Sequence, residues 1–464
     1  MIAQNIKVIA LDDVEDHLIK IVRGLGRAGF SVSPYYYDDG ELEDVPLQRI
    51  EGVRIVFSDI HMAGGGSFDH KMNAATIAKC LKDIISPGPF VIIFWSEYPA
   101  DADLVFPEIC ERLIEVGCIP PIGYGTISKG DVLAASEDST NFDTARLRGL
   151  ILEEIGKFKS LLISAFWEDK VFRGAARSTN ELFEATADCD ENRLEEWLGL
   201  LGYLSSEALG LKKSLEHTNS ALDHAMLPLL EDQLANISRD SENHEIVGHL
   251  RRYIASNDQG INLSKKINIE QVQTGYLIDK HIPDNTKSWE RGVVSEIDRE
   301  FIGSEKFTDA FGGDVVALIR REFATRDLTL DEQPLVSLHA VELGPECDHA
   351  QSKLTSQRYL LAVLVPEELV WAFRGQQNGS TRIPKSIKLR NDGVIDVGNF
   401  CLSETDGSTK NWSLFISCKC FMAFEKEKSF SWTPRFKLRR ALIEDVAHRY
   451  VTHARRPGVM RFAA

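Results

Sequence analysis

Short β-branched runs alternate with amphipathic stretches through the first 135 or so residues of this chain. This alternation is typical of a parallel sheet, because each buried strand needs a crossover helix to bring the chain back to the same edge. Five runs predict strands, at 6–11, 31–37, 53–57, 90–95 and 120–127. Helices are expected at 14–28, 42–50, 74–85 and 104–116, within a plan of five strands and five helices. The pattern predicts a flavodoxin-like doubly wound domain over residues 1–138, with its ligand site at the carboxyl ends of the strands.

Polar side chains stand at the ends of these predicted strands. Asp12 and Asp13 follow the first strand, Asp59 follows the third, Ser96 ends the fourth and Lys129 follows the fifth. Three carboxylates at one sheet edge would repel one another unless a hard divalent cation lay among them, and Mg²⁺ prefers oxygen ligands. The sequence therefore predicts a magnesium site formed by Asp12, Asp13 and Asp59.

The same residues suit phosphoryl transfer. Asp59 could attack a phosphorus atom while Mg²⁺ and the Lys129 ammonium offset the charge on the transferring oxygens, which would give an aspartyl phosphate. The Ser96 hydroxyl could then donate to a phosphoryl oxygen and draw its loop into another position. Taken singly, Asp12 could be a helix cap, Asp59 a turn residue and Lys129 an exposed lysine. Five residue types in the right order at the strand ends outweigh these separate explanations.

The segments Leu11-Asp12-Asp13, Ser58-Asp59-Ile60-His61-Met62, Ser96 and Ser128-Lys129 resemble the response-regulator receiver family. The resemblance covers the first 135 or so residues. It implies phosphorylation of Asp59 by a partner histidine kinase, with Mg²⁺ held by the acidic pair, the acceptor and the backbone carbonyl of His61. It implies no enzymatic activity beyond self-phosphorylation and dephosphorylation at Asp59.

Three positions depart from the receiver pattern. Gly130 stands where a proline usually follows the lysine, Glu97 stands where a small residue usually follows the hydroxyl, and Thr126 stands where an aromatic switch residue is common. A switch coupled through an aromatic side chain is therefore not implied for this chain.

Beyond residue 138 the pattern of the sequence changes twice. Residues 140–262 show a helical periodicity that begins with Leu147, Leu150 and Ile151, and they predict a helical domain. Residues 263–464 mix helical stretches with strand-like runs and predict a β-rich or α+β domain. The runs lie at 359–365, 386–389 and 412–424, and a closing helix is expected near 439–453. We therefore expect a multidomain α/β protein.

The C-terminal region contains cysteine and histidine residues whose role the sequence does not determine. Cys347 and His349 lie in one short segment, and Cys418 and Cys420 are expected on the same side of a strand. These residues could form a zinc site or a Cys347 nucleophile with His349, but the spacing lacks paired CxxC knuckles and a third orienting group. A buried strand face is the plainer interpretation. We find no helix-turn-helix, cyclase or Walker motif.

Charge and cysteine usage limit the classes of partner and compartment. The formal net charge of −17 disfavours nucleic-acid binding, which depends on Lys and Arg, although a basic stretch spans 435–461. That stretch is better explained as a solvated helix face. Eight scattered cysteines and no signal-peptide pattern at the N-terminus predict a cytoplasmic protein with reduced thiols. No apolar run approaches the ~20 residues that a membrane span needs, so no membrane partner is expected.

The layout as a whole resembles the stand-alone phosphate-receiver proteins of the Detocs phage-defence system, through its C-terminal segment from Arg440 to Phe462 and its lack of a known effector. This resemblance implies a phosphate sink or relay beside a histidine kinase and a second receiver protein that bears an effector. Two alternatives stay open: a phosphorylation-gated effector with an enzymatic or nucleic-acid-binding C-terminal domain, and an adaptor that is not phosphorylated. Dimerisation through residues 143–168 is a further hypothesis.

Overall fold

The structure is a computed structural model that describes residues 6–38, 40–62, 69–133, 144–186, 192–240, 245–257, 267–345, 349, 355–375, 389–404, 408–425 and 432–454. By its internal contacts the chain divides into two units. The first is formed by Met1–Leu200 and Ala225–Ile261, and the second by Leu201–His224 and Asn262–Ala464. The boundaries 1–138, 140–262 and 263–464 stay predictions about which segments fold independently.

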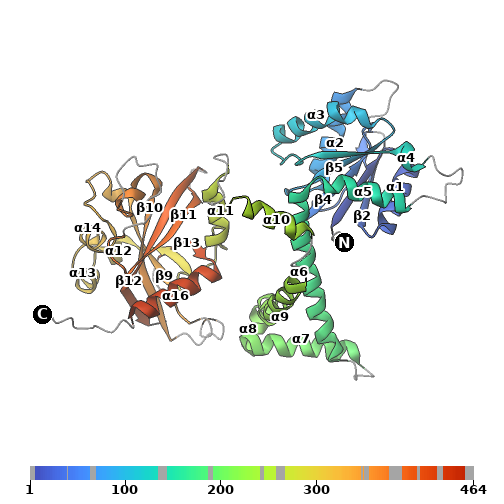
Figure 1. Ribbon diagram of the computed structural model, residues 1–464. Coiled ribbons are helices and arrows are strands. Elements are labelled where there is room, and N and C mark those ends of the chain that lie inside the picture. Colours follow the sequence, from blue (N-terminus) through green and yellow to red (C-terminus); the bar gives the residue numbers. More distant parts are fainter. Residues whose placement is uncertain are drawn as a thin grey trace. The chain divides into compact units, whose positions relative to one another are not determined.

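The first unit contains a sheet with the strand order β3-β2-β1-β4-β5-β6 (Figure 1). Its strands are β1 (Lys7–Asp12), β2 (Ser31–Asp38), β3 (Glu41–Leu42), β4 (Val53–Ser58), β5 (Val91–Ser96) and β6 (Tyr124–Ser128). All pairs are parallel except β2 with β3. Since β1 lies between β2 and β4, the chain winds outward from β1 in both directions, which is the doubly wound arrangement. The five predicted strands are confirmed, and β6 is shorter than its predicted range.

Helices cover both faces of this sheet (Figure 1). On one face lie α1 (Glu15–Arg27) and α5 (Thr144–Gly156), and on the other lie α2 (His70–Ile84) and α3 (Ala102–Glu115). Leu18, Ile21 and Leu25 form the buried stripe of α1, which ends before Gly29 at a φ of 94°. The stripe of α5 is also buried against the sheet, so the core of the sheet continues beyond residue 138. Short helices η1 (Pro99–Asp101) and α4 (Lys129–Leu133) follow β5 and β6.

The helix expected at 42–50 is wrong. Residues Glu41 and Leu42 instead turn back along β2 as the short antiparallel strand β3. Asp44 follows at a φ of 54°, which lies outside the helical region, and Pro46 removes a backbone donor that a helix would use. The connection from β2 to β4 therefore carries no helix, and the predicted five-helix plan is not met.

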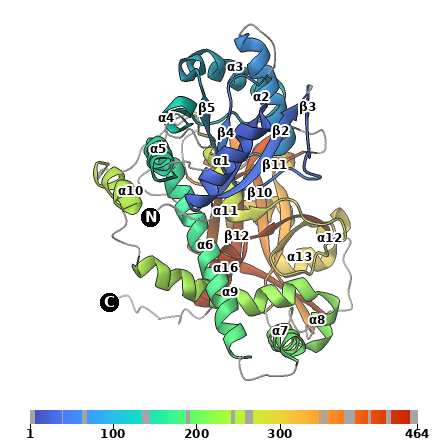
Figure 2. The same cartoon turned by 90° about the vertical axis from the view of Figure 1, so that its right-hand side faces the viewer.

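The residues between 144 and 255 that the structure describes are mainly helical, in agreement with the predicted helical region. Besides α5, the helices are α6 (Lys159–Glu184), α7 (Arg193–Leu209), α8 (Leu211–Glu216), α9 (Thr218–Asp240) and α10 (Glu245–Ala255). The long α6 extends beyond the sheet of the first unit (Figure 2). Glu168 on α6 accepts from Nε and Nη2 of Arg54, with Nε 3.2 and 3.1 Å from its two oxygens, and this pair ties the helix to the start of β4.

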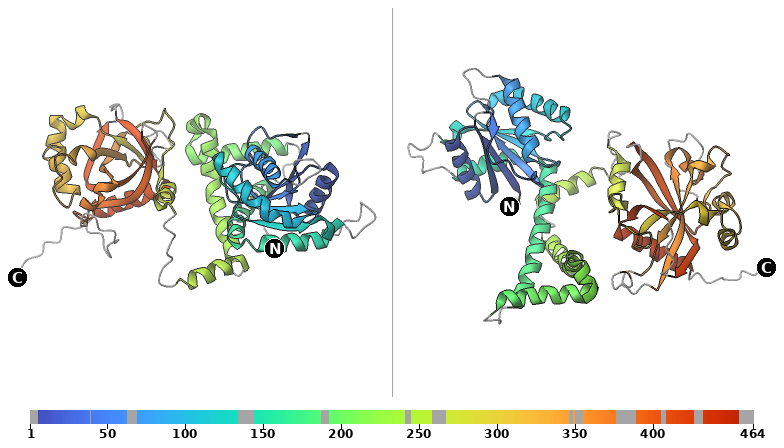
Figure 3. Two further views of the ribbon diagram at one scale, coloured as in Figure 1. Left: turned by 90° about the horizontal axis from the view of Figure 1, so that it is seen from above. Right: turned by 180° about the vertical axis from the view of Figure 1, so that it is seen from behind.

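The second unit contains an antiparallel sheet with the order β11-β12-β10-β9-β8-β13-β7. Its strands are β7 (Ile278–Asp279), β8 (Val293–Glu296), β9 (Ser337–Glu342), β10 (Ser356–Pro366), β11 (Val394–Ser403), β12 (Thr409–Glu425) and β13 (Thr433–Leu438). The sheet is strongly curved, as the left view in Figure 3 shows. The predicted runs at 359–365 and 412–424 are confirmed as β10 and β12. Residues 386–388 of the third run lie outside the described residues.

Both faces of the second sheet are packed. One face buries apolar side chains against α11 (Ile269–Leu277) and α16 (Arg440–Ala454), so the predicted closing helix is confirmed. The other face packs against a series of short helices. These are α12 (Arg299–Ile302), α13 (Glu305–Phe311), α14 (Val315–Leu318), η2 (Ile319–Phe323), η3 (Gln333–Leu335) and η4 (Glu367–Ala372). The C-terminal region thus combines an antiparallel sheet with helices, in agreement with the predicted β-rich or α+β character.

Candidate functional site

The polar residues at the predicted strand ends meet at one edge of the first sheet. Asp12 is the last residue of β1, Asp59 follows β4, Ser96 is the last residue of β5 and Lys129 follows β6. The parallel register places Leu11 beside Ser58 and Ser58 beside Phe94, so β5 and β6 run two residues past the end of β4 at this edge. This convergence is what the strand pattern predicts for a doubly wound sheet.

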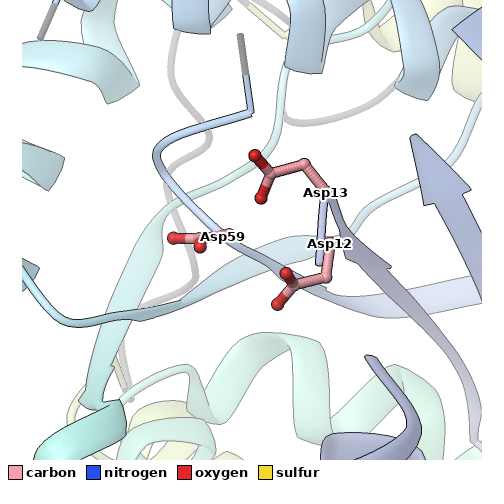
Figure 4. A group of neighbouring side chains, drawn as sticks. All are labelled: Asp12, Asp13 and Asp59. Atoms are coloured by element: carbon pink, nitrogen blue, oxygen red, sulfur yellow. The ribbon is translucent and has the colours of Figure 1, made fainter. Parts of the chain in front are cut away.

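The three carboxylates lie close together, as Figure 4 shows. One oxygen from each of Asp12, Asp13 and Asp59 can be chosen so that all lie within 4.8 Å of one another. Asp12 and Asp59 are buried, with exposed fractions of 1% and 8%. Their Oδ1 atoms accept backbone hydrogen bonds from Val14, at 3.0 Å, and from Ile60, at 2.6 Å. These backbone bonds orient the carboxylates.

The acidic residues repel one another in the absence of a cation. Burial raises the pKa of Asp12 from 3.8 to about 6, against the attraction of Lys129, and the charge of Asp59 raises it further. Burial, and then the charge of Asp59, also raise the pKa of Asp13. Three hard oxygen donors at this distance suit Mg²⁺, because a bound divalent cation would stabilise the ionised carboxylates against their burial and their mutual repulsion. The residues therefore fit the predicted metal.

Lys129 is buried at the centre of the site, so the alternative of an exposed lysine is wrong. Its side chain is 2% exposed. Its Nζ donates to Asp59 Oδ2 at 2.6 Å and to Asp12 Oδ2 at 3.1 Å, and it lies 3.1 Å from His17 Nδ1. The ammonium therefore contacts the proposed acceptor and one proposed metal ligand at once.

Ser96 and His61 lie at the same edge but make other contacts. The Ser96 hydroxyl oxygen is buried and accepts from the backbone N–H of Tyr98, at 3.3 Å. The His61 ring lies 3.0 Å from Asp101 Oδ2 through Nε2 and stacks on Tyr98, with 5.2 Å between the ring centres. The His61 side chain thus joins the loop after β4 to the loop after β5, a contact that the sequence did not predict.

His17, on the first turn of α1, is a further residue at this edge that the sequence pattern did not predict. A histidine one turn into the helix that follows an acidic pair could have been noticed, because the start of such a helix faces the carboxyl ends of the strands. The spacing alone does not show which nitrogen faces Lys129, since that depends on how α1 lies against β1.

The cysteine and histidine residues of the second unit form no metal cluster among the described residues, where only the acidic trio qualifies. Cys347 lies outside the described residues. His349 Nε2 pairs with the buried Glu342, at 2.8 Å. Cys418 and Cys420 are buried on opposite faces of the sheet, so their expected position on one face is wrong. The register shift between β10 and β12 beside them, where Ser417 Oγ accepts from two following backbone N–H groups, is a bulge that turns the strand.

Two remaining expectations concern partners. Among the described helices, none is long and apolar enough to cross a membrane. In the described part of the basic C-terminal stretch, Arg449 Nε lies 2.9 Å from Asp445 Oδ2 one turn earlier, and both side chains are exposed. This pairing is typical of a solvated helix face.

No protein-family model matches the chain, and no curated protein sequence matches it. Matching solved structures include the RcsB response regulator of Salmonella typhimurium, at 17% sequence identity. The match covers 36% of this chain and 78% of that one, with a TM-score of 0.16.

Proposed function

We propose that the first unit is a receiver that accepts a phosphoryl group on Asp59 from a partner histidine kinase. One observation supports this most: three carboxylates have oxygens within 4.8 Å of one another at the carboxyl edge of a doubly wound sheet, and a buried lysine contacts two of them. Three buried or half-buried acids against one ammonium leave a net negative charge, which favours a cationic ligand. A purely structural ion pair would need only one of those acids.

Asp12, Asp13 and Asp59 would hold Mg²⁺, together with the backbone carbonyl of His61 that the family resemblance implies. When bound, Mg²⁺ would neutralise the carboxylates and the oxygens of the incoming phosphoryl group. Side chains of this chain would supply the nucleophile, the ammonium and the hydroxyl group that the reaction also needs.

Asp59 is the nucleophile in this proposal. One of its oxygens forms a bond to phosphorus as the bond from phosphorus to the kinase imidazole nitrogen breaks, and the imidazole leaves with that electron pair. Lys129 already contacts Asp59 Oδ2, at 2.6 Å, so its ammonium is close to the oxygens of the phosphoryl group in the product. Ser96, at the end of the neighbouring strand β5, would donate its hydroxyl hydrogen to one of those oxygens.

The first prediction concerns this chemistry. Incubation of the full chain with Mg²⁺ and a small phosphoryl donor should add one phosphoryl group, detected by intact-protein mass and removed by hydroxylamine, as expected for an acyl phosphate. Asp59→Ala should abolish the adduct. Asp16→Ala is the matched control, because Asp16 is an exposed carboxylate on α1 that pairs with Lys20 and lies outside the trio. An equal adduct on the Asp59 variant, or none on the wild-type chain with either a small donor or a partner kinase, would contradict the proposal.

We propose further that the chain acts as a phosphate sink or relay in bacterial anti-phage signalling, beside a kinase and a second receiver protein. In a mixture of the three, the wild-type chain should lower phosphorylation of the second receiver, and Asp59→Ala should not. A gated effector would instead show a change in activity of its C-terminal unit on phosphorylation. If the chain is an adaptor, the wild-type chain and Asp59→Ala should bind the partners equally well.

A further inference from the structure

His17 lies beside the candidate phosphoryl site and has no role in the chemistry described so far. It stands in the first turn of α1, with a side chain that is 26% exposed. Its Nδ1 lies 3.1 Å from Lys129 Nζ and 4.0 Å from Asp12 Oδ1. The start of α1 is tied to the site, because Asp12 Oδ1 accepts the backbone N–H of Val14. The ring is therefore held next to Lys129 by the helix that carries it.

The chemistry of the two groups determines the direction of this contact. An ammonium has three N–H donors and no acceptor, so the His17 nitrogen that faces it must carry a lone pair, and the ring proton belongs on Nε2. Asp59, Asp12 and His17 supply one acceptor for each of the three donors of Lys129. Burial, and then the charge of Lys129, lower the pKa of His17, which agrees with a neutral ring.

The proposed reaction changes the bonding of two of the three acceptors of Lys129 and leaves the third unchanged. Asp59 bonds to phosphorus, and Asp12 is a ligand that Mg²⁺ would draw toward itself. His17 is neither the nucleophile nor a member of the acidic trio. Its contact with Lys129 can therefore persist while the other two change.

We infer that His17 is a positioning residue for Lys129, which rests on the proposed receiver function. Its Nδ1 holds the ammonium at the site while Lys129 exchanges the Asp59 oxygen for an oxygen of the phosphoryl group. His17 transfers no proton and forms no covalent bond. A neutral acceptor suits this role, because a third carboxylate partner would reduce the positive charge that Lys129 offers to the phosphoryl group.

The test compares two substitutions in the full chain. His17→Leu removes the acceptor, whereas His17→Asn keeps an oxygen close to the place of Nδ1. The Leu variant should be phosphorylated by a small donor about ten- to a hundredfold more slowly, the range for loss of one hydrogen bond to a charged group. The Asn variant should recover most of the rate. Mg²⁺ affinity, measured by calorimetry, should change little in either variant, since the three carboxylates remain.

Nitrogen-15 NMR of the histidine rings gives a readout independent of activity and of Mg²⁺. In the metal-free wild-type chain, His17 should show an unprotonated Nδ1 and a protonated Nε2, and Lys129→Met should change the Nδ1 shift. The opposite tautomer, a Leu variant as fast as wild type, or an Asn variant as slow as the Leu variant would overturn the inference. If the wild-type chain takes no phosphoryl group, the proposed function fails, and the NMR result still decides whether His17 holds Lys129.

Discussion

Asp12 shows how single residues in the candidate site lower the stability of the fold. Its carboxyl is 1% exposed, and its pKa is raised from 3.8 to about 6, mainly by burial. A raised pKa means that the folded chain binds the Asp12 proton more tightly than the unfolded chain does. The ionised form therefore destabilises the folded chain at neutral pH. This cost is absent below about pH 4 and grows as the pH rises through 6.

A second prediction follows for Asp12→Asn. Without Mg²⁺ at pH 7.5, this variant should be more stable than wild type by about 1–3 kcal/mol, because it removes a charge that burial and then the charge of Asp59 destabilise. The gain should shrink toward pH 4, where the wild-type carboxyl is protonated. Added Mg²⁺ should raise the melting temperature of wild type and raise that of the variant less.

Denaturant titrations at the two pH values, with and without Mg²⁺, check this result. Asp16→Asn is the control, because Asp16 is exposed and its pKa is lowered by its contact with Lys20. A loss of stability in Asp12→Asn at pH 7.5, with the control unchanged, would show that the ion pair with Lys129 outweighs the repulsion.

At the scale of elements, strand β9 carries a buried histidine from which we predict that acid destabilises the second unit. His339 is 1% exposed, and burial lowers its pKa from 6.5 to about 4. Its Nδ1 lies 3.2 Å from the carbonyl of Ser337, and its Nε2 has no hydrogen-bond partner among the described residues. Since the unfolded chain binds a proton near pH 6.5 and the folded chain does not, stability should fall as the pH drops through this range.

The third prediction is that His339→Phe reduces this acid sensitivity. The wild-type second unit should lose about 3 kcal/mol between pH 7 and pH 4 through this group, and the variant should not. Hydrogen exchange of backbone amides in β9 and β10, measured at both pH values, reports the local stability. His281→Phe, at an exposed position of the same unit, is the control. Equal acid sensitivity of the His339 variant and wild type would remove His339 as the cause.

At the scale of the whole molecule, the sheet of the first unit depends on residues far from its strands. The side chains of Leu147, Ile151 and Ile155 on α5 are fully buried in the same core as α1. Leu161 and Ala165 on α6 join that core. The apolar stripe of α5 therefore already has a partner within the chain, so dimerisation through 143–168, which stays a hypothesis, would need other side chains. Trp167, which is 61% exposed, is one such side chain.

The fourth prediction tests the extent of this core. A fragment of residues 1–138 should be less stable than a fragment of residues 1–186, because it leaves the sheet face under α5 exposed. Burial of each large aliphatic side chain is worth about 1.5–3 kcal/mol, so loss of the α5 stripe should prevent cooperative unfolding of the shorter fragment. Thermal unfolding followed by circular dichroism checks this. Equal melting temperatures would show that the core ends near residue 138.

The sequence by itself determined the doubly wound plan of the first unit and the polar residues that stand at its strand ends. Both follow from local patterns: the period of apolar residues distinguishes strands from helices, and parallel strands bring their carboxyl ends to one edge. The apolar spacing at 42–50 predicted a helix that is absent. The backbone there has a positive φ at Asp44, and Pro46 lacks the N–H that a helix would use.

Only the tertiary structure decided which groups contact each other and how deeply they are buried. The three acceptors of Lys129, the raised pKa of Asp12 and the opposite directions of Cys418 and Cys420 depend on helix orientation, on burial and on one bulge in β12. These quantities arise from contacts between residues far apart in the chain, and a single residue of register reverses the face that a side chain occupies. The order of residues along one strand does not determine these contacts or their burial.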